Sequence, residues 1–202
     1  MKAFKNIDNV SFDPRWAEAV NIHRSGDVRG SLFLFKKLAN DGCAPALIEV
    51  AQIYEAGGSG VERDIYVAID WYKYAIETID DWRAHLGLGR SYLYLYQRQE
   101  AKSFTNIELM RYHFDLVVKH NNHMGALFAL ALIDERESSS SELVLMQAYY
   151  KAAKQGHLLA RKRALELDTD KSLLNQIRLL SIKFKIFFIA LKKPNDPRLN
   201  IF

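Results

Sequence analysis

The feature that most constrains this chain is a repeated pattern of small and aromatic residues. In the segment 44–75, Ala46, Ala51 and Tyr54 fall on one face of a predicted helix, and the glycine-rich stretch 57–60 ends that helix. Small residues at this spacing let a second helix approach closely, and a large aromatic ring can fill the groove beside them. The segment is therefore predicted to begin with a helix that packs tightly against another one.

The partner helix is predicted to follow within the same segment. Asp64 can cap its first turn, and Ala68, Trp71, Tyr72 and Ala75 make its apolar face. Because the two helices are joined by a short loop, we expect them to form an antiparallel hairpin.

This hairpin pattern recurs along the chain. The second helix recurs as Tyr149-Tyr150-x-x-Ala153, which we align with Trp71-Tyr72-x-x-Ala75, and a shorter unit occupies residues 13–42. No such hairpin can bury both of its faces, so neighbouring hairpins must stack. We therefore predict an all-α solenoid of about four antiparallel helix pairs over residues 1–170. The small pair of the first helix recurs after 38 residues and again after a further 42, as Ala84 with Gly89 and Ala126 with Ala131.

These residues resemble the Sel1-like repeat family, which is related to the tetratricopeptide repeat. The resemblance rests on the segment 44–75, with its Gly58-Ser59-Gly60-Val61 loop, and on the sequence 149–157, and it spans residues 13–165. The third unit departs from the pattern, because residues 97–104 replace the glycine loop. The resemblance implies a right-handed solenoid and a non-catalytic role as an adaptor, a regulator or an inhibitor. It also implies similarity to bacterial immunity proteins that block a cognate toxin.

The segment 171–202 differs from the repeats in charge. It carries seven basic residues and one acidic residue, a net charge of +6, whereas the other 170 residues carry −2 and the whole chain +4. We expect it to form a second part of the chain, a basic and apolar helix with an extended tail, packed on the last repeat as a cap.

Two apolar stripes run along this predicted C-terminal helix, so most of its surface needs a cover. Besides the cap, two interpretations stay open: a helix that binds a partner, and a helix that adsorbs to an anionic membrane surface. The second would make the protein a membrane-surface-associated regulatory protein. The first stripe holds Leu173, Ile177, Leu180, Phe184, Phe187 and Leu191, and the second holds Leu179, Ile182, Ile186 and Ile189.

The repeats predict where a protein partner would bind. Stacked hairpins present their first helices on a concave surface, and the positions not needed for packing are the candidate contacts. Arginine and tyrosine among them are residue types enriched at interfaces. We expect a protein partner, such as a cognate toxin or effector, and no nucleic acid, because the surplus charge lies in an apolar segment. The candidate partner-binding residues are Glu49, Gln52, Glu55, Arg83, Arg90 and Tyr94.

No catalytic or metal site is predicted. His113, His120 and His123 are the closest histidines, but no carboxylate completes a ligand set with them. The glycine stretch 57–60 follows a helix and lacks the lysine of a phosphate-binding loop. The lone Cys43 is expected to be a small packing residue. We therefore expect a protein that is not an enzyme and that holds no metal and no cofactor.

The sequence also indicates the cellular compartment in which the protein is expected. The N-terminal residues contain no apolar run of a secretory signal, and the apolar stretch 179–191 is short and interrupted by Lys183 and Lys185. A single cysteine fits a reducing environment. We therefore predict a cytoplasmic, bacterial protein.

Overall fold

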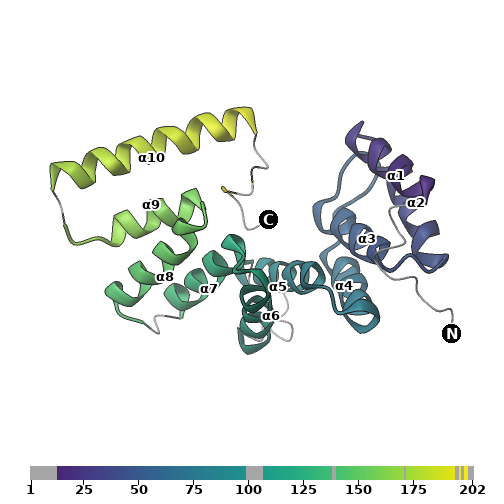
Figure 1. The fold of residues 1–202 in the computed structure, drawn as a ribbon, viewed down its shortest axis with the longest axis horizontal. Helices are drawn as coiled ribbons and strands as arrows, with labels where there is room; N and C mark the ends of the chain where they lie inside the picture. Colours follow the sequence, from purple (N-terminus) through teal and green to yellow (C-terminus); the bar gives the residue numbers. More distant parts are fainter. Residues whose placement is uncertain are drawn as a thin grey trace. The chain divides into compact units, whose positions relative to one another are not determined.

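The computed structural model describes residues 13–98, 107–137, 140–170, 172–193, 196 and 198–199. Over these residues the chain forms ten α-helices joined by turns and loops, without a β-sheet (Figure 1). The helices belong to two compact units, which we call unit 1 (residues 1–105) and unit 2 (residues 106–202).

In unit 1, each helix packs against the one before it. α3 also packs against α5, so the first helices of two successive hairpins lie next to each other, as in a solenoid. The helices of unit 1 are α1 (Pro14–Arg24), α2 (Val28–Asn40), α3 (Ala44–Ala56), α4 (Ile65–Ile79) and α5 (Trp82–Gln97).

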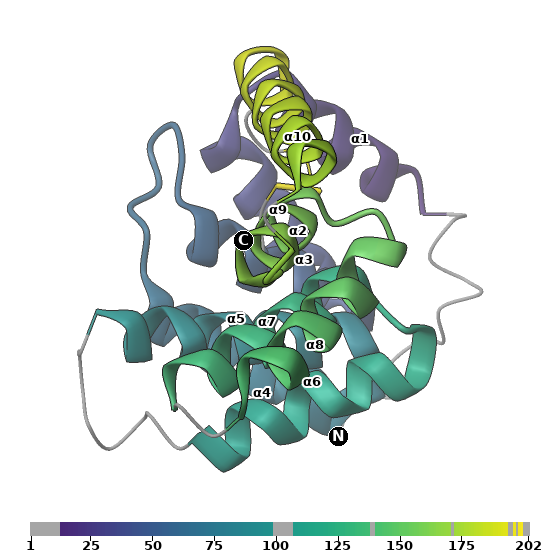
Figure 2. The ribbon, with the colours of Figure 1, turned by 90° about the vertical axis from the view of Figure 1, so that its left-hand side faces the viewer.

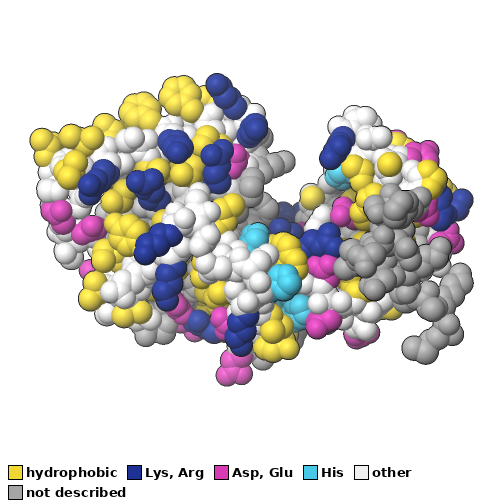
Figure 3. Space-filling model, in the orientation of Figure 1, with side chains coloured by type: hydrophobic (Ala, Val, Ile, Leu, Met, Phe, Trp, Pro, Cys, Tyr) yellow, Lys and Arg dark blue, Asp and Glu magenta, His cyan; other side chains and the backbone are white. Residues whose placement is uncertain are grey.

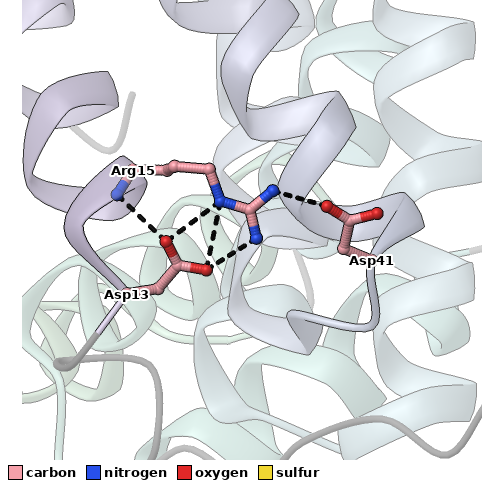
Figure 4. Close-up of polar contacts among 3 residues, drawn as sticks. All are labelled: Asp13, Arg15 and Asp41. Carbon is pink, nitrogen blue, oxygen red and sulfur yellow. Dashed lines mark hydrogen bonds and ion pairs between the residues drawn. The ribbon is translucent and has the colours of Figure 1, made fainter.

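Aspartate side chains begin several helices of unit 1. Asp64 and Asp81 each accept a hydrogen bond from a backbone N–H in the first turn of their helix. α1 begins in the same way at Asp13, and Arg15 joins this cap to Asp41 at the end of α2, with 2.5 Å between Nη1 and Oδ2 (Figure 4). Such caps satisfy N–H groups that have no partner within the helix. Arg15 also ties the start of α1 to the end of α2.

Small residues lie where the helices of unit 1 cross. Ala46, Ala51 and Ala84 are fully buried, as the repeat pattern predicts. The tightest approach is at Gly87 on α5, where an added Cβ atom would overlap the ring and hydroxyl of Tyr72 on α4. Gly87 therefore lets α5 pack directly on the Tyr72 ring.

Unit 2 continues the same arrangement, with each helix from α6 to α10 packed against the next. Histidine takes the place of aspartate as a cap in two of its helices. Nδ1 of His123 accepts from the Gly125 N–H, and Nδ1 of His157 accepts from the Ala160 N–H, both at 3.2 Å. The helices are α6 (Ile107–Asn121), α7 (Met124–Arg136), α8 (Glu142–Lys154), α9 (Leu158–Leu167) and α10 (Leu173–Lys192).

The 20-residue helix α10 lies along α9 (Figures 1 and 2). One of its two apolar stripes packs on α9, and the chain after α10 returns to the same place. There the Leu158 N–H at the start of α9 donates a hydrogen bond of 2.7 Å to the Arg198 carbonyl. The small core between the two helices contains Leu158, Leu165, Leu179, Ile182, Ile186, Ile189 and Leu199.

The predicted all-α fold of helix pairs with a C-terminal capping helix is confirmed. The predicted alignment of α4 with α8 is wrong by one residue, because Tyr72 is matched in burial by Tyr149 and not by Tyr150. Both helices offer two adjacent aromatic residues, and periodicity alone does not say which ring points inward. The expected boundary between residues 170 and 171 separates two segments of different net charge, whereas the two compact units divide after residue 105. The boundary at 170 stays a prediction.

Candidate interaction site

The six predicted contact residues lie on α3 and α5, two neighbouring first helices of unit 1. Glu49 and Gln52 are about one turn apart on α3, and both are half-buried. Arg83, at the start of α5, is half-buried as well. We call these three side chains the first-helix site, because the other three predicted residues are engaged in contacts with other helices or loops of unit 1.

Glu49 is the central residue of the first-helix site. Burial raises the pKa of its carboxyl group, and the neighbouring basic groups of Arg83 and His23 offset this effect only in part. His23 comes from α1 and Arg83 from α5, so Glu49 is surrounded by basic groups from the hairpins on both sides. None of the described residues donates a hydrogen bond to its side chain. Among the described residues, Glu49 is therefore a partly desolvated carboxylate without a hydrogen-bond donor.

Arg83 is held by the cap of its own helix. Its Nε donates to Oδ1 of Asp81 at 3.0 Å, and its Nη2 donates to Oδ2 at 2.8 Å. These hydrogen bonds raise the pKa of Arg83 above its ordinary value. Arg83 is therefore a fixed positive charge at the edge of the first-helix site.

Glu55 and Arg90 form an internal network with Tyr72, contrary to the prediction that they are free for a partner. The Tyr72 hydroxyl donates to Oε2 of Glu55 at 2.5 Å. Arg90 donates through Nε to Oε1 at 3.0 Å and through Nη2 to Oε2 at 2.5 Å. The Glu55 side chain is 8% exposed and that of Arg90 is 18% exposed. The network joins α3, α4 and α5, so both residues are needed for packing.

The electrostatics of this network fix the role of each group. Burial, together with the charge of Glu55, raises the pKa of Tyr72 well above its ordinary value, so the phenol stays protonated and donates. Burial by itself lowers the pKa of Arg90, but the charge and hydrogen bonds of Glu55 outweigh burial and raise it. Arg90 is therefore a permanent cation paired with a buried carboxylate.

Tyr94 is covered by arginine side chains of unit 1. The Arg63 guanidinium lies over its ring, 4.0 Å from the centroid, and Arg98 lies 5.4 Å from the same point. Arg63 belongs to the loop between α3 and α4, so this contact ties that loop to the end of α5. The ring is engaged within unit 1 and does not belong to the first-helix site.

Unit 2 contains a second network of the same three groups, which the sequence analysis missed. Tyr149 on α8 donates to Oε2 of Glu135 on α7 at 2.5 Å, and Arg163 on α9 pairs with the same carboxylate. The hydrogen bond from Arg163 is the main reason that the pKa of Glu135 is lowered. The signal in the sequence is the glutamate, because Glu55 and Glu135 occupy the same position of the repeat.

The three closest histidines of the sequence, for which no metal site is predicted, lie on α6 and in the turn between α6 and α7. His113 is buried on α6, while His123 caps α7. In the part of the chain that the structure describes, no three histidine, cysteine or acidic side chains are placed to hold a metal ion. Within the same residues, no helix combines the length and the apolar character that crossing a bilayer requires.

Together these features define an α-solenoid whose successive hairpins are joined by polar networks. The chain is similar to the solved structure of a Sel1 repeat protein from Oxalobacter formigenes, with a TM-score of 0.62 over 88% of this chain and 76% of that chain. The two sequences are 18% identical, so this likeness shows the fold, and it confirms the predicted Sel1-like architecture. No family model matches the chain, and no curated protein matches it.

Proposed function

We propose that this protein is a non-catalytic protein-interaction module that binds a protein partner through the first-helix site of unit 1. The observation that carries the proposal is Glu49, a half-buried carboxylate with a raised pKa and no donor from the described residues. We expect such a group to lower the stability of the free protein, which favours a role in binding. A lysine or arginine of a partner would supply the missing donor.

The neighbouring side chains support a protein as the ligand. Gln52 adds an amide that can donate and accept, and Arg83 adds a fixed cation that can pair with an acidic group of the partner. The site thus offers charges of both signs within a short stretch of two adjacent helices. Mixed charges of this kind favour a protein surface with a complementary pattern over a uniformly charged polymer.

The finer role that we propose is that of an inhibitor, in the manner of an immunity protein, or of an adaptor, acting in the bacterial cytoplasm. The similarity to a Sel1 repeat protein supports a scaffold role. The proposal is that the solenoid acts by occupying a surface of a toxin or effector, without chemistry of its own.

The test uses three variants of the full chain: Glu49→Gln, Gln52→Ala and, as a matched control, Glu77→Gln on the outer side of α4. Each is immobilised, and the proteins retained from a lysate of the native host are identified by mass spectrometry. We expect a protein that is retained by the wild type and by Glu77→Gln but lost from Glu49→Gln and weakened in Gln52→Ala. Glu49→Gln should at the same time melt at a higher temperature than the wild type at pH 7. An identical set of retained proteins for all four chains would contradict the proposal.

A further inference from the structure

The first apolar stripe of α10, which begins at Leu173, faces away from the core that joins α10 to α9. Its aliphatic and aromatic side chains are between 55% and 73% exposed. Figure 3 shows hydrophobic side chains gathered over this helix, with Lys and Arg side chains beside them. We call this surface the outer apolar face; it consists of Leu173, Ile177, Leu180, Phe184, Phe187, Phe188 and Leu191.

Capping of the repeats does not require the outer apolar face. The opposite stripe already makes the contact with α9, and Ile182 at its centre is buried. A helix that served only as a cap would be polar on its solvent side. Seven large apolar side chains on one solvent-facing helix form a patch of the kind that marks an interaction surface.

The charges on α10 indicate which kind of surface the outer apolar face binds. The helix has no acidic residue from Leu173 to Lys192, and its basic side chains are exposed. At about 100° per residue, Lys183 lies at one border of the outer apolar face, and Arg178, Lys185 and Lys192 lie at the other. Long basic side chains at both borders of an apolar face can extend toward anionic lipid headgroups while the apolar face enters the acyl region.

Two other occupants fit this pattern less well. A second copy of the chain would place the lysines of one α10 against those of the other, and α10 has no acidic residue to compensate. A bilayer-spanning helix is a poor fit for α10, because its 20 residues include four basic side chains, and no described helix combines the length and the apolar character that crossing requires. An anionic bilayer surface can bury the outer apolar face and pair its headgroups with the basic side chains at both borders.

We propose that α10 is an interfacial helix that binds the protein to anionic membrane surfaces. Its axis lies in the plane of the membrane, its outer apolar face enters the headgroup and acyl boundary, and its other stripe stays packed on α9. The proposal is independent of the first-helix site, which lies in unit 1.

The test is flotation of the full-length protein with vesicles of phosphatidylcholine alone and of phosphatidylcholine with phosphatidylserine. We expect binding to the anionic vesicles, weaker binding to the neutral ones, and loss of binding as salt is raised. Removing two of the basic residues, in Lys183→Gln/Lys185→Gln, should weaken binding about 30-fold, because each contributes a factor of about five near an anionic surface.

A second pair of variants tests the outer apolar face against a matched control. Phe184→Gln/Phe187→Gln should abolish binding, whereas Phe33→Gln removes an even more exposed aromatic ring from α2 of unit 1 and should leave binding unchanged. All four side chains that are changed on α10 are exposed, so each variant should keep the melting temperature of the wild type.

Three results would overturn the proposal. The first is a wild-type chain that does not float with anionic vesicles, or that floats equally with neutral ones. The second is equal binding by Phe184→Gln/Phe187→Gln and Phe33→Gln. The third is a dimer in analytical ultracentrifugation that Phe184→Gln/Phe187→Gln dissociates, because the outer apolar face would then be covered by a second copy.

Discussion

The two Tyr–Glu–Arg networks contain the same groups in different surroundings. In unit 1, the Glu55 and Arg90 side chains are 8% and 18% exposed, whereas in unit 2 the Glu135 and Arg163 side chains are 23% and 40% exposed. Water can therefore replace a lost partner in unit 2 far more easily than in unit 1. We therefore expect burial, and not the identity of the groups, to set how much each unit depends on its network.

Each network also joins three consecutive helices of its unit. In unit 1 the carboxylate comes from α3, the phenol from α4 and the guanidinium from α5, and in unit 2 they come from α7, α8 and α9. Because hydrogen bonds are directional, the three helices must keep one relative position to satisfy the carboxylate. The networks thus add a fixed register to the less specific packing of apolar side chains.

The largest effect is expected from removing the arginine. Arg90→Leu should lower the free energy of unfolding by about 3–5 kcal/mol, because it leaves the Glu55 carboxylate buried without its cation. Arg163→Leu should lower it by only about 1 kcal/mol, because Glu135 remains accessible to water. Urea denaturation of the full chain at pH 7, followed by circular dichroism, measures both values.

The double variant Glu55→Leu/Arg90→Leu serves as the control for the first prediction. Removing both charges leaves no unpaired carboxylate, so part of the stability lost in Arg90→Leu should return. Equal losses in Arg90→Leu and Arg163→Leu would show that burial does not govern the strength of the two networks.

The sequence was sufficient to predict helices and their packing faces, because both depend on periodicity within one segment. The buried Ala46 and Ala84, and the two stripes of α10, follow from such local spacing. The sequence was not sufficient for Glu55 and Arg90, which the same spacing assigned to the concave surface as positions not needed for packing. Their hydrogen-bond partners lie on other helices, and the residue pattern of one helix does not predict a hydrogen bond to a residue of the next hairpin.

The arginine of the network illustrates this limit further. Arg163 lies about one turn earlier in α9 than Arg90 lies in α5, measured from the caps His157 and Asp81. It occupies the position that Gly87 holds in α5. Both arrangements place a guanidinium beside the glutamate, since residues one turn apart share a helix face. An alignment of the repeats position by position would therefore not pair the two arginines.

A smaller effect is expected from filling the space at Gly87. Gly87→Ala should lower the free energy of unfolding by about 1–3 kcal/mol, because the methyl group displaces Tyr72 from its place beside Glu55. Alanine favours a helix by up to about 1 kcal/mol over glycine, so the overlap with Tyr72 outweighs the gain in helix propensity. Thermal denaturation and urea denaturation of the full chain report the change.

The matched control for Gly87→Ala is the same substitution in a Tyr72→Leu background. Without the ring the added methyl group has room, and the substitution should be close to neutral or stabilising. A loss of the same size in both backgrounds would show that Gly87 is required for a reason other than the approach of Tyr72. No counterpart is expected in unit 2, where Arg163 stands at this position.

The smallest effects concern pH, and they have opposite signs at Glu135 and Glu49. Arg163 lowers the pKa of Glu135 below the ordinary value of 4.5, so its stabilisation is present above that value and is lost as the pH falls through the pKa of the folded state. Burial raises the pKa of Glu49 above 4.5, so its stabilisation is present below that value and is lost as the pH rises through the pKa of the folded state.

Replacing each carboxyl group by an amide separates these two contributions. At pH 7, Glu135→Gln should lower the free energy of unfolding by about 1 kcal/mol, and Glu49→Gln should raise it by a smaller amount. Near pH 3, where Glu49 is protonated in the folded and unfolded states alike, Glu49→Gln should have no effect, while the loss in Glu135→Gln should shrink. Urea denaturation between pH 3 and pH 8 measures both curves. A loss of stability in Glu49→Gln at pH 7 would mean that the favourable interactions of Glu49 with Arg83 and His23 outweigh the cost of its burial. The Glu49 carboxylate would then stabilise the fold, which would contradict its proposed role in binding a cation of a partner.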